Sequence, residues 1–280
     1  MNRLAGRLSS LQAIRFSSSA PPQFHLERLT GKDAGIVVFH MNRPETKNAI
    51  SKIFLQQLRE SISTVRFCKD TRVVILKSDV PGAFCTGADL KERKTMPTEE
   101  VPVFVDKLRS SFYELETLPQ PVIAAIDGFA LGGGLEMALS CDIRVASKNA
   151  KVGLTETKLA IIPGAGGTQR LARVVGRSVA KELIFTARMI GGEEAARIAL
   201  VNHVVEDPFN KALEIAREII PRGPVAVRLA KTAIDLGSQM DLSSGLLVEQ
   251  QAYAQIVPTK DRIEGLKAFA EKRSPVYKGE

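Results

Sequence analysis

Short apolar runs alternate with longer amphipathic stretches over most of this chain. Runs rich in β-branched residues predict buried strands at residues 36–41, 73–76, 122–126, 143–146 and 200–205. Between them, apolar residues recur at helical spacing and predict amphipathic helices over residues 51–65 and 97–118. Strands that alternate with helices are typical of an α/β fold.

The pattern changes to helices alone beyond Asp207. Pro, Gly and Ser residues separate four further helical stretches, at residues 210–220, 224–236, 241–255 and 258–271. A helical section of about 70 residues buries too little apolar surface for a core of its own. We therefore expect an α/β core at residues 20–207 and a C-terminal section, residues 208–280, that packs on this core or on a neighbouring subunit.

Residues 1–19 differ from the rest of the chain in composition. They contain Arg3, Arg7 and Arg15, five serines and no acidic residue, a combination typical of a mitochondrial transit peptide. A disordered basic tail is the alternative. Removal of these three arginines lowers the formal net charge from +8 to +5, which is compatible with an anionic ligand or weak nucleic-acid contact.

Composition excludes several other classes of protein. The chain is 44% hydrophobic and 25% charged, which is ordinary for a globular protein, and no apolar run approaches the length of a membrane-spanning helix. Its three cysteines form no CxxC pair, and its three histidines are scattered. These residues therefore predict neither a disulfide framework nor a metal site, and they favour a reduced compartment.

Residues 124–167 combine glycines with two acidic residues. Gly132, Gly133 and Gly134 follow the predicted strand at 122–126 and open an apolar helical segment. Glycines at a helix start allow the main chain to approach a ligand closely, and free N–H groups there favour negative charge. Glu136 and Glu156 lie in the same stretch, although singly each has an ordinary explanation, as a helix-dipole partner and as a solvated loop residue.

Three separated phrases resemble the signature of the enoyl-CoA hydratase/isomerase (crotonase) superfamily. They are Cys85-Thr-Gly-Ala-Asp-Leu-Lys91, Asp127-Gly-Phe-Ala-Leu-Gly-Gly-Gly-Leu-Glu136 and Ile161-Ile-Pro-Gly-Ala-Gly-Gly-Thr-Gln-Arg170. Their order and spacing make the resemblance far more specific than one glycine motif. It implies a crotonase-type spiral of ββα units, followed by C-terminal helices that join subunits into a homotrimer or homohexamer.

The resemblance also implies how the site works. The main-chain N–H groups of Ala88 and Gly133 match the pair that binds the thioester oxygen, and such fixed donors stabilise the charge of an enolate-like intermediate. Glu136 and Glu156 match the catalytic pair. Hydration needs one group to take a proton from water and another to supply one, so we expect Glu136 to act chiefly as the base and Glu156 chiefly as the proton donor.

Further residues match family segments that hold coenzyme A or the acyl group. Lys47 and Lys91 are expected at the phosphates, although a solvated surface lysine is the alternative for either one. The other matching positions are Asn48, Ala49, Asp89, Leu90, Gly132 and Gly164. Asp89 has capping of the following helix or turn as its alternative. Residues 78–84 and 95–105 are expected to border the acyl pocket, with Phe104 either in its wall or in the core.

Three functions remain open from the sequence. The first is a hydratase of the mitochondrial matrix that acts on a short branched 2-enoyl-CoA, with conversion of 3-methylglutaconyl-CoA to 3-hydroxy-3-methylglutaryl-CoA in leucine degradation as the best single candidate. The second is an enoyl-CoA isomerase. The third is a non-catalytic RNA-binding member, for which five spaced cations between Lys47 and Lys69 give thin support. No metal or redox cofactor is implied, because coenzyme A is part of the substrate.

Overall fold

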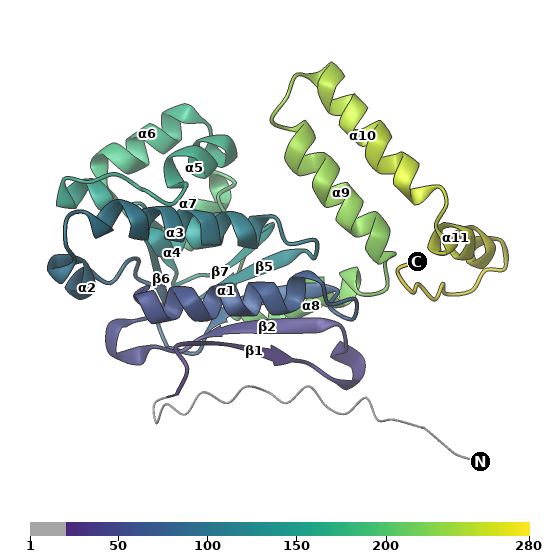
Figure 1. The fold of residues 1–280 in the computed structure, drawn as a ribbon, viewed down its shortest axis with the longest axis horizontal. Helices are drawn as coiled ribbons and strands as arrows, with labels where there is room; N and C mark the ends of the chain where they lie inside the picture. Colours follow the sequence, from purple (N-terminus) through teal and green to yellow (C-terminus); the bar gives the residue numbers. More distant parts are fainter. Residues whose placement is uncertain (1–20) are drawn as a thin grey trace, which may run out of the picture.

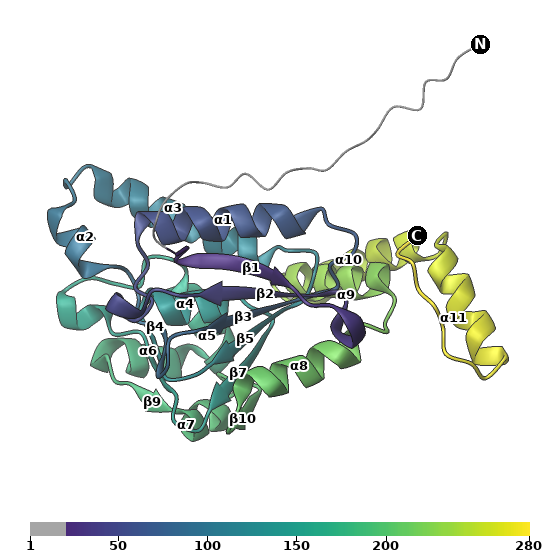
Figure 2. The ribbon, with the colours of Figure 1, turned by 90° about the horizontal axis from the view of Figure 1, so that it is seen from below.

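The computed structural model describes residues 21–280, so the predicted transit peptide lies outside the described residues. Within them, six strands form one sheet in the order β1, β2, β3, β5, β7, β10 (Figure 1 and Figure 2). The strands are β1 (Phe24–Arg28), β2 (Ile36–Met41), β3 (Val73–Ser78), β5 (Val122–Ile126), β7 (Ile143–Ser147) and β10 (His203–Val205). All neighbours are parallel except β1, which pairs antiparallel with β2.

Over the middle of the chain, consecutive strands alternate between this sheet and a second, four-stranded sheet. It contains β4 (Ala83–Cys85), β6 (Phe129–Leu131), β8 (Lys151–Gly153) and β9 (Ile190–Gly191), in that order. The consecutive strands β3 and β4, β5 and β6, and β7 and β8 each add one strand to both sheets before the chain continues into a helix. This repetition is the predicted spiral of ββα units.

Helices bury both faces of the larger sheet. Figure 2 shows α1 (Lys52–Arg66) and α3 (Glu100–Glu116) on one side and α8 (Pro208–Ile219) on the other. Along β2, Val37 and Phe39 pack into the cluster that includes α1, whereas Ile36 and Val38 pack against α8. Because both faces are covered, the central strands are largely apolar, which is why the hydrophobic pattern predicted them.

The smaller helices surround the second sheet. They are α2 (Leu90–Thr95), α4 (Gly133–Leu139), α5 (Gly167–Val175), α6 (Arg177–Thr186) and α7 (Gly192–Arg197), with a 3-10 helix, η3 (Glu156–Leu159). The predicted helix at 97–118 is α3, which begins at Glu100. The predicted strand at 200–205 is β10, which is shorter because Ala199 adopts a left-handed conformation, with φ +59°, and the chain re-enters the sheet only at His203.

The last three helices are α9 (Pro224–Gly237), α10 (Leu242–Ile256) and α11 (Lys260–Ala270), close to their predicted bounds. They extend away from the two sheets (Figure 1). Large apolar side chains on them are exposed, including Leu247, Tyr253, Leu266 and Phe269. No helix among residues 21–280 is long and apolar enough to cross a membrane.

Candidate active site

A cavity of about 590 Å³ brings the predicted catalytic residues together. Glu136 and Glu156 both line it, although they are 20 positions apart in the chain. The two predicted oxyanion donors, Ala88 and Gly133, line the same cavity, as do Leu90, Gly132 and Gly164. The remaining lining includes Val105 and Leu108 from α3 and the loop that follows η3.

Glu136 is held by the loop that precedes α5. It is 2% exposed, and its Oε1 accepts hydrogen bonds from the N–H groups of Ala165, at 2.8 Å, and Gly167, at 2.7 Å. Burial raises the pKa of this carboxyl, whereas the two N–H donors act in the opposite direction. Gly167 allows this approach, because a Cβ there would lie 2.9 Å from Oε1. The carboxylate is therefore fixed with one oxygen occupied and the other available to a ligand.

Glu156 begins η3 and has a different environment. Burial, with a further contribution from the charge of Glu136, raises the pKa of Glu156 to about 7. Its Oε2 is buried and has no hydrogen-bond partner among residues 21–280. Its Oε1 lies against Gly132, where a Cβ would approach to 3.1 Å. Burial therefore raises the pKa of both carboxyls, and near neutral pH the carboxyl of Glu156 is in part protonated.

The backbone around the cavity presents two N–H groups to the same region. A β-bridge joins Ile50 to Ala88, but its hydrogen bonds use the carbonyl of Gly87 and the N–H of Asp89. The N–H of Ala88 therefore points to the other side, as alternate residues of an extended chain do. Gly133 is the first residue of α4, whose N–H has no intrahelical acceptor. A Cβ at Gly87 would lie 3.3 Å from the N of Gly133, and a Cβ at Gly133 would lie 3.6 Å from the N of Ala88. The two donors are therefore close neighbours.

Most of the chain matches a known protein family. Residues 31–280 match the family model described as enoyl-CoA hydratase/isomerase. The chain belongs to the enoyl-CoA hydratase/isomerase (crotonase) superfamily. It is therefore an enzyme of acyl-CoA chemistry, as the three sequence phrases predicted.

The relatives agree in fold and in most of the sequence. The chain is 53% identical to a mouse protein named methylglutaconyl-CoA hydratase, mitochondrial, over 92% of this chain and 84% of the mouse protein. It is also 53% identical to a probable mitochondrial enoyl-CoA hydratase 2 of Arabidopsis thaliana, over 93% and 88% of the two chains. A crystal structure of an enoyl-CoA hydratase from Bacillus anthracis has a TM-score of 0.89, with 50% identity over 92% of this chain and all of that one. The predicted crotonase fold is confirmed.

The predicted coenzyme A residues are placed less uniformly than the glutamates. Leu90, Gly132 and Gly164 line the cavity, whereas Lys47 and Lys91 are exposed and do not. The side chain of Asn48 is fully buried and donates to Ser78 Oγ at 2.7 Å and to the Phe84 carbonyl at 3.0 Å. This side chain therefore holds its own loop, and Ala49 beside it is also buried. Contacts between these segments and coenzyme A stay predictions.

Asp89 takes its alternative role. Its carboxylate accepts from the N–H groups of Lys91 and Glu92 at the start of α2, and it pairs with the Arg43 guanidinium at 2.7 Å. The guanidinium and these hydrogen bonds hold the pKa of Asp89 below its usual range, although burial alone would raise it. The ion pair therefore fixes the loop that carries Ala88.

Sequence reasoning placed the acyl pocket only in part. Phe104 takes its alternative place: it is 5% exposed, belongs to the hydrophobic core, and borders a separate groove between α1 and α3. Residues 78–84 do not line the cavity either, and from the segment 95–105 only Val105 does. Two arginines that were not predicted, Arg93 and Arg109, do line it. No local pattern indicated Arg93, because its place depends on α2, which the sequence did not predict.

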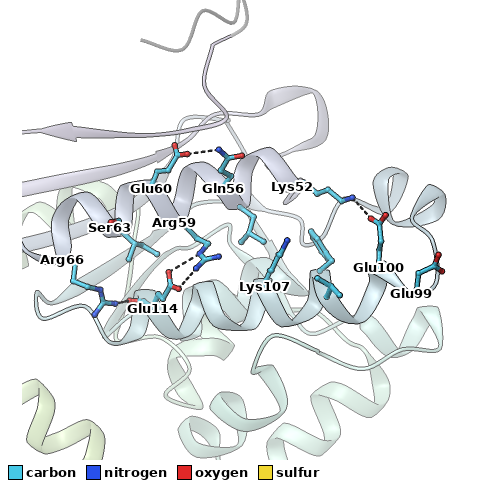
Figure 3. Close-up of a pocket in the computed structure, with 14 residues that line it drawn as sticks. Lys52, Gln56, Arg59, Glu60, Ser63, Arg66, Glu99, Glu100, Lys107 and Glu114 are labelled. Carbon is cyan, nitrogen blue, oxygen red and sulfur yellow. Dashed lines mark hydrogen bonds and ion pairs between the residues drawn. The ribbon is translucent and has the colours of Figure 1, made fainter. Parts of the chain in front are cut away.

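The groove between α1 and α3 bears on the RNA hypothesis (Figure 3). It has a volume of about 940 Å³, and two of the four cations that line it form ion pairs. Lys52 meets Glu100 at 2.9 Å, Arg59 meets Glu114 at 2.9 Å, and Arg66 donates to the Glu114 carbonyl. The two ion pairs neutralise part of the positive charge that a phosphate backbone requires. RNA binding stays an untested prediction.

Two of the three histidines meet in space although they are far apart in the sequence. His25 and His40 are cross-strand partners in β1 and β2, and their rings stack with centroids 4.7 Å apart. His40 lies between Asp79 and Glu27, with one ring nitrogen 3.0 Å from each carboxylate. Asp79 also pairs with Lys77 at 2.9 Å. The cluster crosses the edge of the larger sheet through hydrogen bonds of His40 and one ion pair, between Lys77 and Asp79.

Proposed function

We propose that this enzyme hydrates a short branched 2-enoyl-CoA by adding water syn across the 2,3 double bond. The observation that carries the proposal is the meeting of two carboxyls with different environments beside two main-chain donors. Glu136 is fixed by two N–H groups, and the pKa of Glu156 is raised to about 7. Combined acid and base catalysis needs two titratable groups whose different environments suit one to accept a proton and the other to donate one.

The reaction follows from this placement. The thioester oxygen accepts hydrogen bonds from the N–H groups of Ala88 and Gly133, which stabilises the negative charge that develops on it by several kcal/mol. Ionised Glu136 takes a proton from water as the water oxygen attacks C3. Protonated Glu156 gives its proton to C2. Because the two carboxyls are electrostatically coupled, they titrate as a pair, and the division of roles belongs to the pair.

We infer 3-methylglutaconyl-CoA as the substrate and the mitochondrial matrix as the compartment. The support is the 53% identity to the mouse methylglutaconyl-CoA hydratase and the mitochondrial names of that protein and its plant relative. The arginine-rich, serine-rich and acid-free composition of residues 1–19 agrees with import into mitochondria. Hydration of this substrate gives 3-hydroxy-3-methylglutaryl-CoA, a step in leucine degradation, and requires no metal or redox cofactor.

We also infer that the enzyme is a homotrimer or a homohexamer. The support is the projection of α9, α10 and α11 from the rest of the chain together with their exposed apolar side chains. Phe269 is 88% exposed and Leu242 is 78% exposed, and burial of such side chains against another copy is favourable. Sedimentation of the purified protein distinguishes these assemblies from a monomer.

The substrate assignment is tested by hydration kinetics. We expect kcat/KM for 3-methylglutaconyl-CoA to exceed that for crotonyl-CoA by at least about tenfold, which corresponds to ~1.4 kcal/mol of transition-state stabilisation. Equal values would leave a general short-chain hydratase. Migration of the double bond without hydration, retained in Glu136→Gln, would point to an isomerase.

A further inference from the structure

The cavity contains two positive charges that the hydration mechanism does not use. Arg93 from α2 and Arg109 from α3 line it together with the two glutamates. The glutamates supply and accept protons, and the main-chain N–H groups of Ala88 and Gly133 meet the thioester oxygen. The reaction at C2 and C3 therefore leaves both guanidinium groups without a role.

Arg93 lines the cavity from α2. Leu90 and Arg93 lie one turn apart and both line the cavity, whereas Lys91 and Lys94 are exposed on the other faces of this helix. The Arg93 guanidinium lies over the Phe104 ring, 5.5 Å from its centroid, and not against a carboxylate of residues 21–280. A guanidinium held on an aromatic ring keeps its hydrogen-bond donors for a ligand.

Arg109 approaches the same cavity from α3. Its Nε donates to the carbonyl of Gly164 at 3.0 Å, next to the Ala165 N–H that binds Glu136. Its only acidic neighbour within 4 Å among the described residues is Asp106, at 3.7 Å on the exposed face of the same helix. Burial raises the pKa of Glu136, and the positive charge of Arg109 opposes this rise slightly, so its field reaches the catalytic pair.

The apolar lining indicates where an acyl chain would run. Leu90 lies one turn before Arg93 on α2, and Val105 lies one turn before Arg109 on α3. An acyl chain whose thioester oxygen is at Ala88 and Gly133 can pack on these apolar side chains. One turn after each apolar side chain comes a guanidinium, that of Arg93 on α2 and that of Arg109 on α3. The planar fork of a guanidinium matches a carboxylate in a bidentate contact.

We propose that Arg93, assisted by Arg109, binds a carboxylate at the far end of the acyl group, so that the site selects monothioesters of short dicarboxylic acids. This inference rests on the proposed function for the position of the thioester. An acyl group that ends in a methyl leaves the Arg93 guanidinium in the cavity without a carboxylate partner, whereas the side chain of Arg109 is 55% exposed and stays hydrated. A site that pairs a polar group of its substrate discriminates strongly against analogues that lack the group.

Binding of two saturated thioesters tests the inference apart from catalysis. Glutaryl-CoA and butyryl-CoA have the same acyl backbone up to C4, and they differ by one terminal carboxylate. We expect calorimetric titration of the wild-type enzyme to give a Kd at least tenfold lower for glutaryl-CoA. In Arg93→Met this preference falls to less than threefold, while the Kd of butyryl-CoA changes by less than twofold. Arg109→Met reduces the preference partially.

Matched variants separate the acyl carboxylate from the phosphates of coenzyme A, which are also anions. Lys94→Met removes an exposed cation from the same helix and is expected to leave the preference intact. Arg93→Lys keeps the charge without the fork and is expected to retain an intermediate preference. Equal weakening of both ligands by Arg93→Met would assign Arg93 to the coenzyme A phosphates and overturn the inference. Absence of any preference in the wild type would also overturn it.

The outcome is separable from that of the proposed function. Neither thioester has a double bond, so both bind without reacting. A carboxylate preference that depends on Arg93, in an enzyme that hydrates no enoyl-CoA, would support the inference and refute the hydratase. Hydration of an enoyl-CoA by an enzyme with no carboxylate preference would support the hydratase and refute the inference about Arg93.

Discussion

Substitution of Glu156 by glutamine should change how stability depends on pH. In the folded enzyme burial and the charge of Glu136 raise the pKa of this carboxyl from 4.5 to about 7. The folded state therefore binds the Glu156 proton more tightly than the unfolded state does. For such a group the folded state loses stability as the pH rises from 4.5 to about 7, and the loss is complete above that range. Glutamine is neutral throughout and is spared this loss.

The magnitude follows from the difference in pKa. At about 1.4 kcal/mol for each pKa unit, a rise from 4.5 to about 7 corresponds to ~3 kcal/mol as an upper value. Glu156 is partly exposed, and screening by solvent reduces the expected effect to about 1–2 kcal/mol. We therefore expect Glu156→Gln to gain about 1–2 kcal/mol relative to the wild type between pH 5 and pH 8.

Denaturant unfolding at fixed protein concentration measures this difference. The free energy of unfolding of the wild type and of Glu156→Gln is compared at several values between pH 5 and pH 8. Glu218→Gln is the control. It removes the same charge, but from a carboxyl that is exposed on α8. The reasoning is refuted if the difference between Glu156→Gln and the wild type stays flat over this range or falls as the pH rises.

Three further predictions concern the same site. Because protonated Glu156 is the proposed donor, kcat/KM for hydration should fall as the pH rises through about 7, and a rate that keeps rising to pH 9 contradicts this assignment. Gly132→Ala places a Cβ 3.1 Å from Glu156 Oε1, at a residue with φ +51°. The rate of hydration should therefore fall by about tenfold or more. A normal rate in a variant with a native circular dichroism spectrum would show that the close approach of Gly132 to Glu156 is unimportant. Arg43→Leu leaves the buried Asp89 carboxylate unpaired and should cost about 3–5 kcal/mol in denaturant unfolding, against less than about 1 kcal/mol for the exposed Lys52→Leu.

The parts of the fold that the sequence predicted are those with a strong local pattern. β2, β3, β5 and β7 are apolar on both faces, and α1 carries its apolar residues on one face, so each is visible in a short window. Five strands were missed: β4, β6 and β8 have three residues each, β9 has two, and β1 is an edge strand of five residues whose outer side is partly exposed. A run of three residues has no measurable period, and its pairing depends on strands that are distant in the sequence.

The candidate site divides in a similar way. Glu136, Glu156, Ala88 and Gly133 were found from motif resemblance, and the structure brings all four to one cavity. Arg93 was missed because a single charged residue in a short polar helix is ordinarily solvated. Its direction depends on α2, which begins at Leu90 because the buried Asp89 caps it. That capping is a tertiary feature, since Asp89 is itself held by Arg43.

The central claim is that Glu136 and Glu156 hydrate an enoyl thioester as a pair, and single-turnover kinetics test it most directly. Excess enzyme is mixed with 3-methylglutaconyl-CoA, and loss of the ultraviolet absorbance of the conjugated thioester reports hydration for the wild type, Glu136→Gln and Glu156→Gln. The account predicts that each substitution slows hydration by roughly 10²–10⁴-fold while the Kd of glutaryl-CoA changes by less than about fivefold. Hydration by either variant at near the wild-type rate would contradict it.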